Sequence, residues 1–247
     1  MKRILIIATL IIMSLQTMAQ GNRGYGVPNW ISIAGKVGFG TSIMFCEDVK
    51  NDDNAKQIYF SPALSVGGRL GVVFKDRIGV SVEYLSSDYQ HKYEFTAPGD
   101  AQARKTNLRI KTGDLLVLAR YTGEYGFYAE VGPKMTFVKN IECTEASQTY
   151  TQTNCFQSKY NSIVFGFGFS PYNGDRIIVT LGLRAAYCSK DIVVKPVSED
   201  GFSGTGFTQY PNLDMKPFSA QVMIDVNYHF ARFGKASCGA KRVIFFK

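Results

Sequence analysis

Residues 115–139 read LLVLARYTGEYGFYAEVGPKMTFVK and contain two segments, 115–121 and 127–137, that a short turn separates. In both segments apolar and polar side chains alternate with a period of two residues. Leu115 and Val117 share one face, whereas Arg120, Glu130 and Lys134 lie on the other. This alternation is typical of a β-strand whose two faces meet different surroundings.

The same alternation recurs along most of the chain. It predicts eight strands, at residues 31–45, 60–74, 78–84, 115–121, 127–137, 163–169, 177–187 and 218–230. On the apolar faces of these strands, no position is Asp, Glu, Lys or Arg. The opposite faces carry nine charged residues, namely Lys36, Arg69, Glu83, Asp114, Arg120, Glu130, Lys134, Arg184 and Asp225.

Alternation alone fits both a soluble sandwich, with its apolar face inside, and a membrane barrel, with its apolar face against lipid. The connections favour the barrel, because long and short connections alternate strictly; the short ones are 75–77, 122–126 and 170–176. Outer-membrane barrels have short periplasmic turns and long extracellular loops. We therefore predict an all-β fold: an eight-stranded antiparallel up-and-down transmembrane β-barrel. Ten strands remain an alternative if the second long loop or the tail adds a hairpin.

The two ends of the chain differ from the repeating middle. Lys2 and Arg3 precede an apolar run and the small residues before Gln20, a pattern typical of a secretory signal peptide. We predict a signal peptide at residues 1–19, a barrel at 20–230 and a C-terminal tail of unclear role at 231–247. The predicted location is the outer membrane of a Gram-negative bacterium, reached after export.

The stretch 115–139 also resembles part of a known family. The matching residues are Arg120-Tyr121, the tight turn, and the run from Phe127 to Lys134, FYAEVGPK. They are similar to the porin-type (OmpA-like or PorT-like) outer-membrane β-barrels of Gram-negative bacteria. The resemblance implies insertion by the barrel-assembly machinery and contact with outer-membrane lipid. Members of the family usually end at or just past a terminal Phe, whereas this chain continues from 231 to 247.

The nine charged residues on the polar faces are predicted to point into the barrel. An eight-stranded barrel has an interior just wide enough for side chains, and buried charges are tolerated only when they are paired. We expect an ion-pair network that plugs the lumen; the alternative is a narrow ion path.

Leu108 and Ile110 have even numbers, whereas Leu115 and Val117 in strand 115–121 have odd numbers. With a period of two, these apolar residues share one face only if the strand contains an extra residue, which predicts a bulge near Thr112 and Gly113.

Five cysteines occur in a chain that is predicted to reach an oxidising compartment. Cys143 and Cys155 lie in one outer loop and form one expected disulfide. Cys46 and Cys188 follow the outer ends of two strands and form a second candidate pair, which leaves Cys238 over. No C-x-x-C spacing occurs and the chain has only two histidines, so no metal site and no cofactor are predicted.

The sequence favours a non-enzymatic protein with a structural or surface-interaction role, or a minor porin. Two alternatives are a lipid-modifying enzyme, with Ser86, Ser87, Asp88 and His91 as candidate groups, and a soluble periplasmic ligand-binding barrel.

Basic side chains favour anionic head groups. The expected lipopolysaccharide contacts are Arg104, Lys105, Arg109 and Lys111 in the second long loop. The net charge of +8 is dispersed, and no nucleic-acid partner is predicted.

Overall fold

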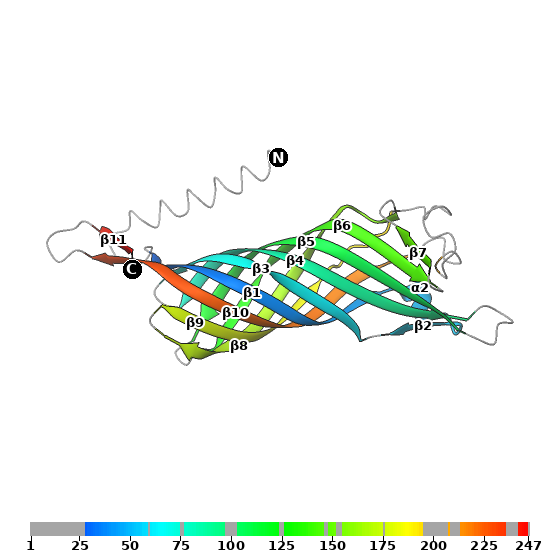
Figure 1. Cartoon of the computed structure of the whole chain (residues 1–247), viewed down its shortest axis with the longest axis horizontal. Coiled ribbons are helices and arrows are strands. Elements are labelled where there is room, and N and C mark those ends of the chain that lie inside the picture. Colours follow the sequence, from blue (N-terminus) through cyan, green and yellow to red (C-terminus); the bar gives the residue numbers. More distant parts are fainter. Residues whose placement is uncertain are drawn as a thin grey trace.

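The computed structural model is an elongated barrel of antiparallel strands that cross its long axis obliquely (Figure 1). It describes residues 28–58, 60–74, 77–96, 103–123, 126–145, 148–151, 155–174, 176–194, 207, 213–235 and 242–246. The predicted signal peptide and Cys238 lie outside these residues. Among the described residues, no helix combines the length and the apolar character needed to cross a bilayer.

Eight strands form a closed ring, in the order β1-β3-β4-β5-β6-β8-β9-β10, and β10 pairs again with β1. Their bounds are β1 Pro28–Phe45, β3 Ser61–Phe74, β4 Ile78–Phe95, β5 Arg104–Thr122, β6 Tyr128–Glu145, β8 Lys159–Asn173, β9 Ile177–Tyr187 and β10 Lys216–Lys235. Every pair is antiparallel and consecutive along the ring. The predicted eight-stranded up-and-down barrel is therefore confirmed.

Four further elements lie outside the ring. They are the helix α2 Glu47–Lys50 and the strands β2 Ala55–Ile58, β7 Gln148–Thr151 and β11 Arg242–Phe246. β2 pairs with β4, β7 with β6, and β11 with the end of β10. Strand β10 continues to Lys235, so the expected boundary between barrel and tail at residue 230 falls inside a strand.

The strands are staggered around the ring. Following directly paired residues from Pro62 on β3 leads back to β3 at Val72, ten positions along that strand. The path is Pro62, Thr41, Ala220, Ala185, Phe165, Val131, Ala119, Val80 and Val72. In a barrel, strand number, stagger and tilt are linked. Over one circuit, the row of paired residues therefore climbs along β3 from Val72, near the turn, to Pro62, near the outer end of the strand.

The two faces of the wall differ as the alternation predicts. Ile33, Val82 and Phe167 are exposed on the outside, and Phe167 has 62% of its surface accessible. Lys36, Glu83 and Asp225 are buried inside, with 2%, 0% and 0% accessible. This arrangement is the reverse of a soluble sandwich, in which the apolar face would be buried, so the sandwich interpretation is wrong.

Strands β4, β5 and β6 extend furthest beyond the ranges that the sequence predicted. We expected the segment between Tyr84 and Leu115 to be mostly loop, but β4 reaches Phe95 and β5 begins at Arg104. Strand β6 likewise reaches Glu145. In these extensions the apolar side chains point inward and most charged ones outward, with buried Glu145 as an exception. The alternation expected of lipid-facing strands therefore does not reveal them.

A register irregularity lies between Lys111 and Thr112 in the pairing of β5 with β6. Thr112 pairs with Val138 and Lys111 with Asn140, so the extra residue is Lys139 of β6. The expected bulge is at this level, but it belongs to β6. Strand β5 itself alternates regularly, since Leu108 and Ile110 point inward while Leu115 and Val117 point outward.

Candidate functional site

The interior of the membrane-facing half contains one connected network of ion pairs. Lys36 Nζ lies 2.7 Å from Glu83 Oε1 and 3.4 Å from Asp225 Oδ2. Arg69 Nη1 lies 3.5 Å from the same Asp225 oxygen, and Arg120 Nη2 lies 2.6 Å from Glu130 Oε2. Because burying an unpaired charge is costly, this mutual pairing is what makes a charged interior tolerable.

Two of these ion pairs cross the lumen. Arg184 on β9 reaches Glu83 on β4, with Nη1 2.7 Å from Oε2, and Arg120 on β5 reaches Asp225 on β10 at 3.3 Å. In a ring of eight strands, β9 and β4 are diametrically opposite, and so are β5 and β10. Arg184 also donates to Glu130, which joins both crossings into one network. Side chains that touch across the full width of the barrel leave no open channel at this level.

Strand β8 contributes space instead of charge. A side-chain carbon added at Gly166 would meet the Glu130 carboxylate at 2.8 Å. The glycine therefore gives Glu130 the room to accept from both Arg120 and Arg184. This requirement explains an inward-facing glycine in the middle of a strand, where glycine is otherwise unfavourable.

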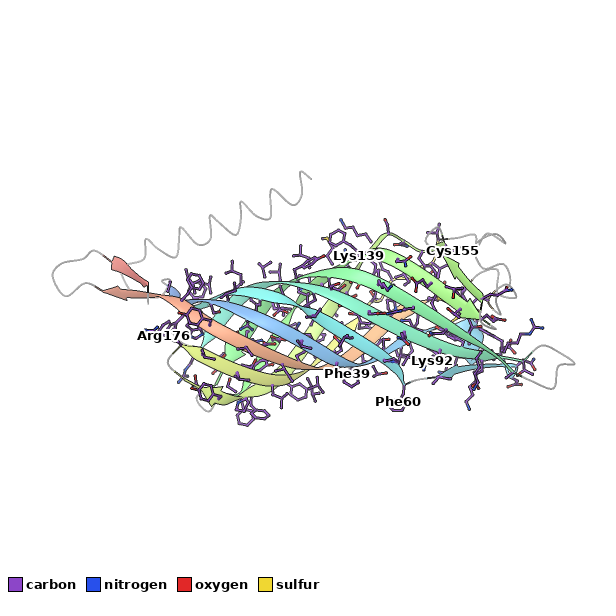
Figure 2. All side chains as sticks on the ribbon, in the orientation of Figure 1. Phe39, Phe60, Lys92, Lys139, Cys155 and Arg176 are labelled. Carbon is purple, nitrogen blue, oxygen red and sulfur yellow. The ribbon has the colours of Figure 1, made fainter. Side chains whose placement is uncertain are left out.

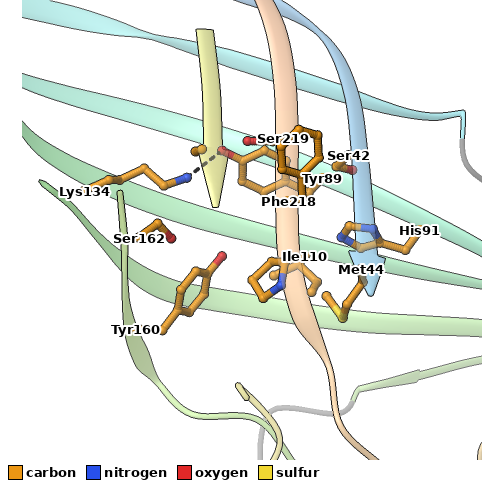
Figure 3. A pocket seen from close by; sticks show the side chains of 12 residues that line it. Ser42, Met44, Tyr89, His91, Ile110, Lys134, Tyr160, Ser162, Phe218 and Ser219 are labelled. Atoms are coloured by element: carbon orange, nitrogen blue, oxygen red, sulfur yellow. Dashed lines mark hydrogen bonds between the residues drawn. The ribbon is translucent and has the colours of Figure 1, made fainter. Parts of the chain in front are cut away.

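A second ion pair lies closer to the outer end. Lys134 Nζ is 3.7 Å from Asp114 Oδ2, which also accepts from the hydroxyls of Ser87 and Tyr89. Lys134 Nζ lies 3.3 Å from the Tyr89 hydroxyl, at the side of a small internal pocket that His91 and Tyr160 also line (Figure 3). The structure thus places all nine predicted interior charges inside the barrel, in two groups.

Above this pocket, the outer end of the barrel is filled by an apolar cluster, which we call the outer cap. Its buried members are Met44, Cys46, Val49, Tyr93, Phe95, Leu108, Ile110, Ile141, Cys143, Cys155, Phe156, Tyr160, Cys188, Ile192, Val193, Phe207, Leu213 and Met215. The Phe207 ring packs edge-on against Tyr93 and Phe95, with centroids 4.9 and 5.1 Å away. The lumen is therefore closed at a second level, by packing.

Chain segments from outside the ring complete the outer cap. Phe156 forms a β-bridge with Val193, and the Ile192 amide donates to the Met215 carbonyl at 3.0 Å. The Cys188 amide donates to the Pro217 carbonyl at the same distance. These bonds satisfy backbone groups that would otherwise be buried unpaired. Sequence reasoning missed the cap, although Tyr93 and Phe95 alternate with Lys92 and Glu94.

Neither expected disulfide is formed. Cys46, Cys143, Cys155 and Cys188 are all buried thiols of the outer cap. Cys143 is the backbone partner of Tyr150, because β6 and β7 form a hairpin. The Cys155 carbonyl, further along the chain, accepts a hydrogen bond from the Val194 amide. The Cys188 Sγ is turned to the Lys190 carbonyl, 3.3 Å away. Burial raises the pKa of the Cys46 thiol to about 11.

The candidate catalytic groups do not converge. Asp88 points outward and forms a bidentate pair with Arg109, whereas His91 points inward and is buried. Ser87 also points inward, and it donates to Asp114. No hydrogen bond joins His91 to a carboxylate, and its Nδ1 has no hydrogen-bond partner among the described residues. The arrangement of nucleophile, base and carboxylate that such catalysis needs is not assembled here.

The four expected lipopolysaccharide contacts lie on β5, not in a loop. Arg109 is 2.5 Å from Asp88, Lys111 is 3.6 Å from Glu142, and Lys105 is 3.8 Å from Glu94. Arg104 begins the strand. Three of the four charges are thus partly neutralised by carboxylates of the neighbouring strands.

Among the described residues, no group of three His, Cys, Asp or Glu is arranged to hold a metal ion.

The outside of the barrel carries an apolar band with aromatic residues at both edges (Figure 2). Exposed rings near the turns are Tyr121, Phe127, Phe169, Tyr172 and Tyr228; those toward the outer end are Phe45, Phe60, Tyr84, Phe137 and Tyr187. Lys139 lies over the Tyr84 ring at 5.8 Å, and Lys159 over Phe137 at 5.6 Å. Aromatic girdles around an apolar band are the exterior of a transmembrane barrel.

Comparisons with solved structures find similar barrels at low sequence identity. OprG from Pseudomonas aeruginosa is 14% identical, with 82% of this chain and 97% of that chain covered and a TM-score of 0.43. The N-terminal barrel domain of OprF from the same organism is 13% identical, with 81% and 98% covered and a TM-score of 0.38. Neisserial surface protein A is 8% identical, with 81% and 97% covered and a TM-score of 0.40.

No protein-family model and no curated protein matches the sequence. The geometry of the chain itself defines its class. A closed ring of eight antiparallel strands, an apolar exterior with two aromatic girdles and a charged interior together make it a β-barrel of the outer-membrane type.

Proposed function

We propose that this chain is an integral outer-membrane barrel with a closed lumen and a structural or surface-interaction role. The observation that carries the proposal is the pair of ion contacts across the ring, Arg184–Glu83 and Arg120–Asp225. The outer cap adds a second closure. A pore needs a continuous polar path through the barrel. The ion pairs across the ring block such a path at one level, and the apolar outer cap blocks it at another. The closed lumen therefore argues against the role of a minor porin.

The proposal includes export by the predicted signal peptide and insertion by the barrel-assembly machinery. It also includes a non-enzymatic role, which the separation of His91 from Asp88 supports. Lipid and lipopolysaccharide are the proposed neighbours of the apolar band and of the basic side chains above it. A surface ligand would meet the outer ends of the strands, because binding residues are concentrated on such outer segments.

Planar-bilayer recording of the purified protein tests the proposal. We expect no stepwise current from wild-type protein whose insertion is verified by protease protection in liposomes. Reproducible conductance steps from the inserted protein would show that the lumen is open and would contradict the proposal.

Fractionation tests the location. The protein is expected to stay with outer-membrane fragments after a carbonate wash, as an integral protein does. Recovery in the soluble periplasmic fraction would support the ligand-binding alternative instead.

A further inference from the structure

Small side chains form a trough across three strands of the apolar exterior. Thr41, Ala220 and Ala185 are directly paired neighbours on β1, β10 and β9. One row of bulky residues lies below them and another above: Phe39, Val222, Leu183 and Phe167, and then Ile43, Phe218, Tyr187 and Ile163. Phe60 and Pro62 border one end and Phe165 the other, and the groove encloses about 570 Å³.

The dimensions of the trough suit a single hydrocarbon chain. From β3 to β8 it spans four strand spacings, about 19 Å. This length is comparable to half of a hydrocarbon core that is about 30 Å thick. Phe39 and Ile43 are four residues apart on β1, about 13 Å along the strand, and their side chains occupy part of that width. An α-helix with its side chains is about 10–12 Å across, which is too wide for the remaining gap.

The trough rises toward the outer end of the barrel. On one side, its row of paired residues passes from Phe165 to Val131 and Ala119, within the apolar band. On the other side, it ends at Pro62, and the next strand, β4, presents the polar residues Gln90 and Lys92 at this level. A chain lying in the trough therefore has its tail in the membrane and its head group at the outer surface.

Lys92 stands at this upper end. Its backbone amide donates to the Ser61 hydroxyl at 3.2 Å, and Figure 2 shows Lys92, Phe60 and Phe39 near one another along one flank. The side chain is exposed, and no carboxylate lies within ion-pair distance of its Nζ in the part of the chain that the structure describes.

The other outward carboxylates of β4 do not neutralise this lysine. Asp88 is bound to Arg109, and Glu94 lies 3.8 Å from Lys105. An uncompensated ammonium group at the top of an apolar trough is complementary to an amphiphile with an anionic head group.

We propose that the trough binds one acyl chain of a lipopolysaccharide molecule, with a phosphate of the same molecule on Lys92. The proposal rests on the outer-membrane placement given above and refines it. It also shifts the expected lipopolysaccharide contact from the paired residues of β5 to an unpaired lysine of β4. Lipopolysaccharide is the occupant because the trough opens toward the outer surface, where that lipid is the phosphate-bearing component.

The test compares lipid retention by the full-length protein and its variants. Each protein, refolded in detergent, is incubated with purified lipopolysaccharide, phosphatidylglycerol or phosphatidylcholine, and the lipid bound after washing is measured by native mass spectrometry. Ala185→Phe combined with Ala220→Phe fills the trough, and Lys92→Gln removes the charge. Matched controls are Ala119→Phe, an exposed alanine of the same row outside the trough, and Lys139→Gln, which removes an exposed lysine of β6 that does not border the trough.

We expect the filled trough to lower lipopolysaccharide retention about tenfold and Lys92→Gln to lower it about fivefold. Both controls should stay within about twofold of wild type. Retention unchanged in the filled variant, or phosphatidylglycerol retained as well as lipopolysaccharide, would overturn the proposal. Heat-dependent gel migration verifies the fold of every variant. A wild-type protein that stays non-conducting while failing this test would leave the closed barrel intact and remove only the lipid site.

Discussion

The membrane-facing half of the barrel and its outer cap use the same strands in opposite ways. On β4, Val80, Val82 and Tyr84 point outward below the boundary while Glu83 points inward. Further along the same strand, Asp88 is on the outside, and Tyr93 and Phe95 are packed inside. The backbone pairing with β5 continues through both halves without a register shift.

This difference shows that hydrogen bonding between strands does not decide which face is apolar. The surrounding solvent decides it. Where hydrocarbon surrounds the wall, apolar side chains face out and charges must pair inside. Where water surrounds it, the wall encloses an apolar core as in any soluble protein. A single cylinder can therefore contain an inside-out half and a conventional half.

The largest expected effect comes from breaking the interior network. Glu83→Ala removes the carboxylate that Lys36 and Arg184 share, so that Lys36 keeps only Asp225 and Arg184 only Glu130 as ion-pair partner among the described residues. Denaturant unfolding in detergent micelles should show a loss of about 3–5 kcal/mol. The control Glu94→Ala, whose partner Lys105 is mostly exposed, should cost less than about 1 kcal/mol. Equal losses in the two variants would show that the interior charges are solvated.

The next effect is in the outer cap. Leu108→Ala leaves a cavity among fully buried neighbours and should cost about 2–5 kcal/mol. Limited proteolysis should then cut the outer segments faster while the membrane-facing strands stay protected. Leu115→Ala is the matched control, since Leu115 faces outward on the same strand, where lipid refills the space. A larger loss at Leu115 would contradict the two-half arrangement.

A smaller effect concerns the chemistry of the cap. Burial raises the pKa of Cys46 to about 11, so its thiol is protonated at pH 8, and only 2% of the residue is exposed to solvent. In a variant that keeps Cys46 as its only cysteine, maleimide should label the folded protein at pH 8 about tenfold more slowly than the unfolded one. A thiol with a raised pKa stabilises the fold below its ordinary pKa, and this contribution is lost as the pH rises through about 11. Equal labelling rates would show that the cap is open.

The smallest expected effect is on the outer surface. Arg109→Gln removes the exposed pair with Asp88 and should cost about 0.2–1 kcal/mol at low salt, and less at high salt. Thermal unfolding at two ionic strengths measures both values. A salt-independent loss of several kcal/mol would mean that this pair is not at a water-exposed surface.

Much of the fold was predictable, because the apolar faces of eight strands keep their period of two along the membrane-facing half. The inward placement of Arg69 and Glu130 followed from the same period. The ion-pair partners of these residues could not be predicted from the alternation. Arg184 and Glu83, for example, are 101 residues apart and meet only because of the stagger around the ring. Alternation assigns a face to a residue but not its height in the barrel.

The outer half was harder to predict for the same physical reason. Residues 85–95 alternate as regularly as the membrane strands, but their apolar side chains face a core instead of lipid. Because this half has no outward apolar stripe, the sequence prediction placed Lys105 and Arg109 in a loop, whereas both lie on β5. It also grouped Asp88 with His91, which lie on opposite faces of one strand. The structure forms neither predicted disulfide, although Cys46, Cys143, Cys155 and Cys188 are all buried in the outer cap.

The central claim is that lipid surrounds the first half of β4 and water the second. The chain has one tryptophan, Trp30, so Trp30→Phe provides a background in which Val82→Trp and Gln90→Trp each report on one outward position. In vesicles of lipids with brominated acyl chains, the fluorescence of Val82→Trp should be strongly quenched and that of Gln90→Trp almost unaffected. Equal quenching at both positions, or quenching at Gln90→Trp alone, would contradict this account.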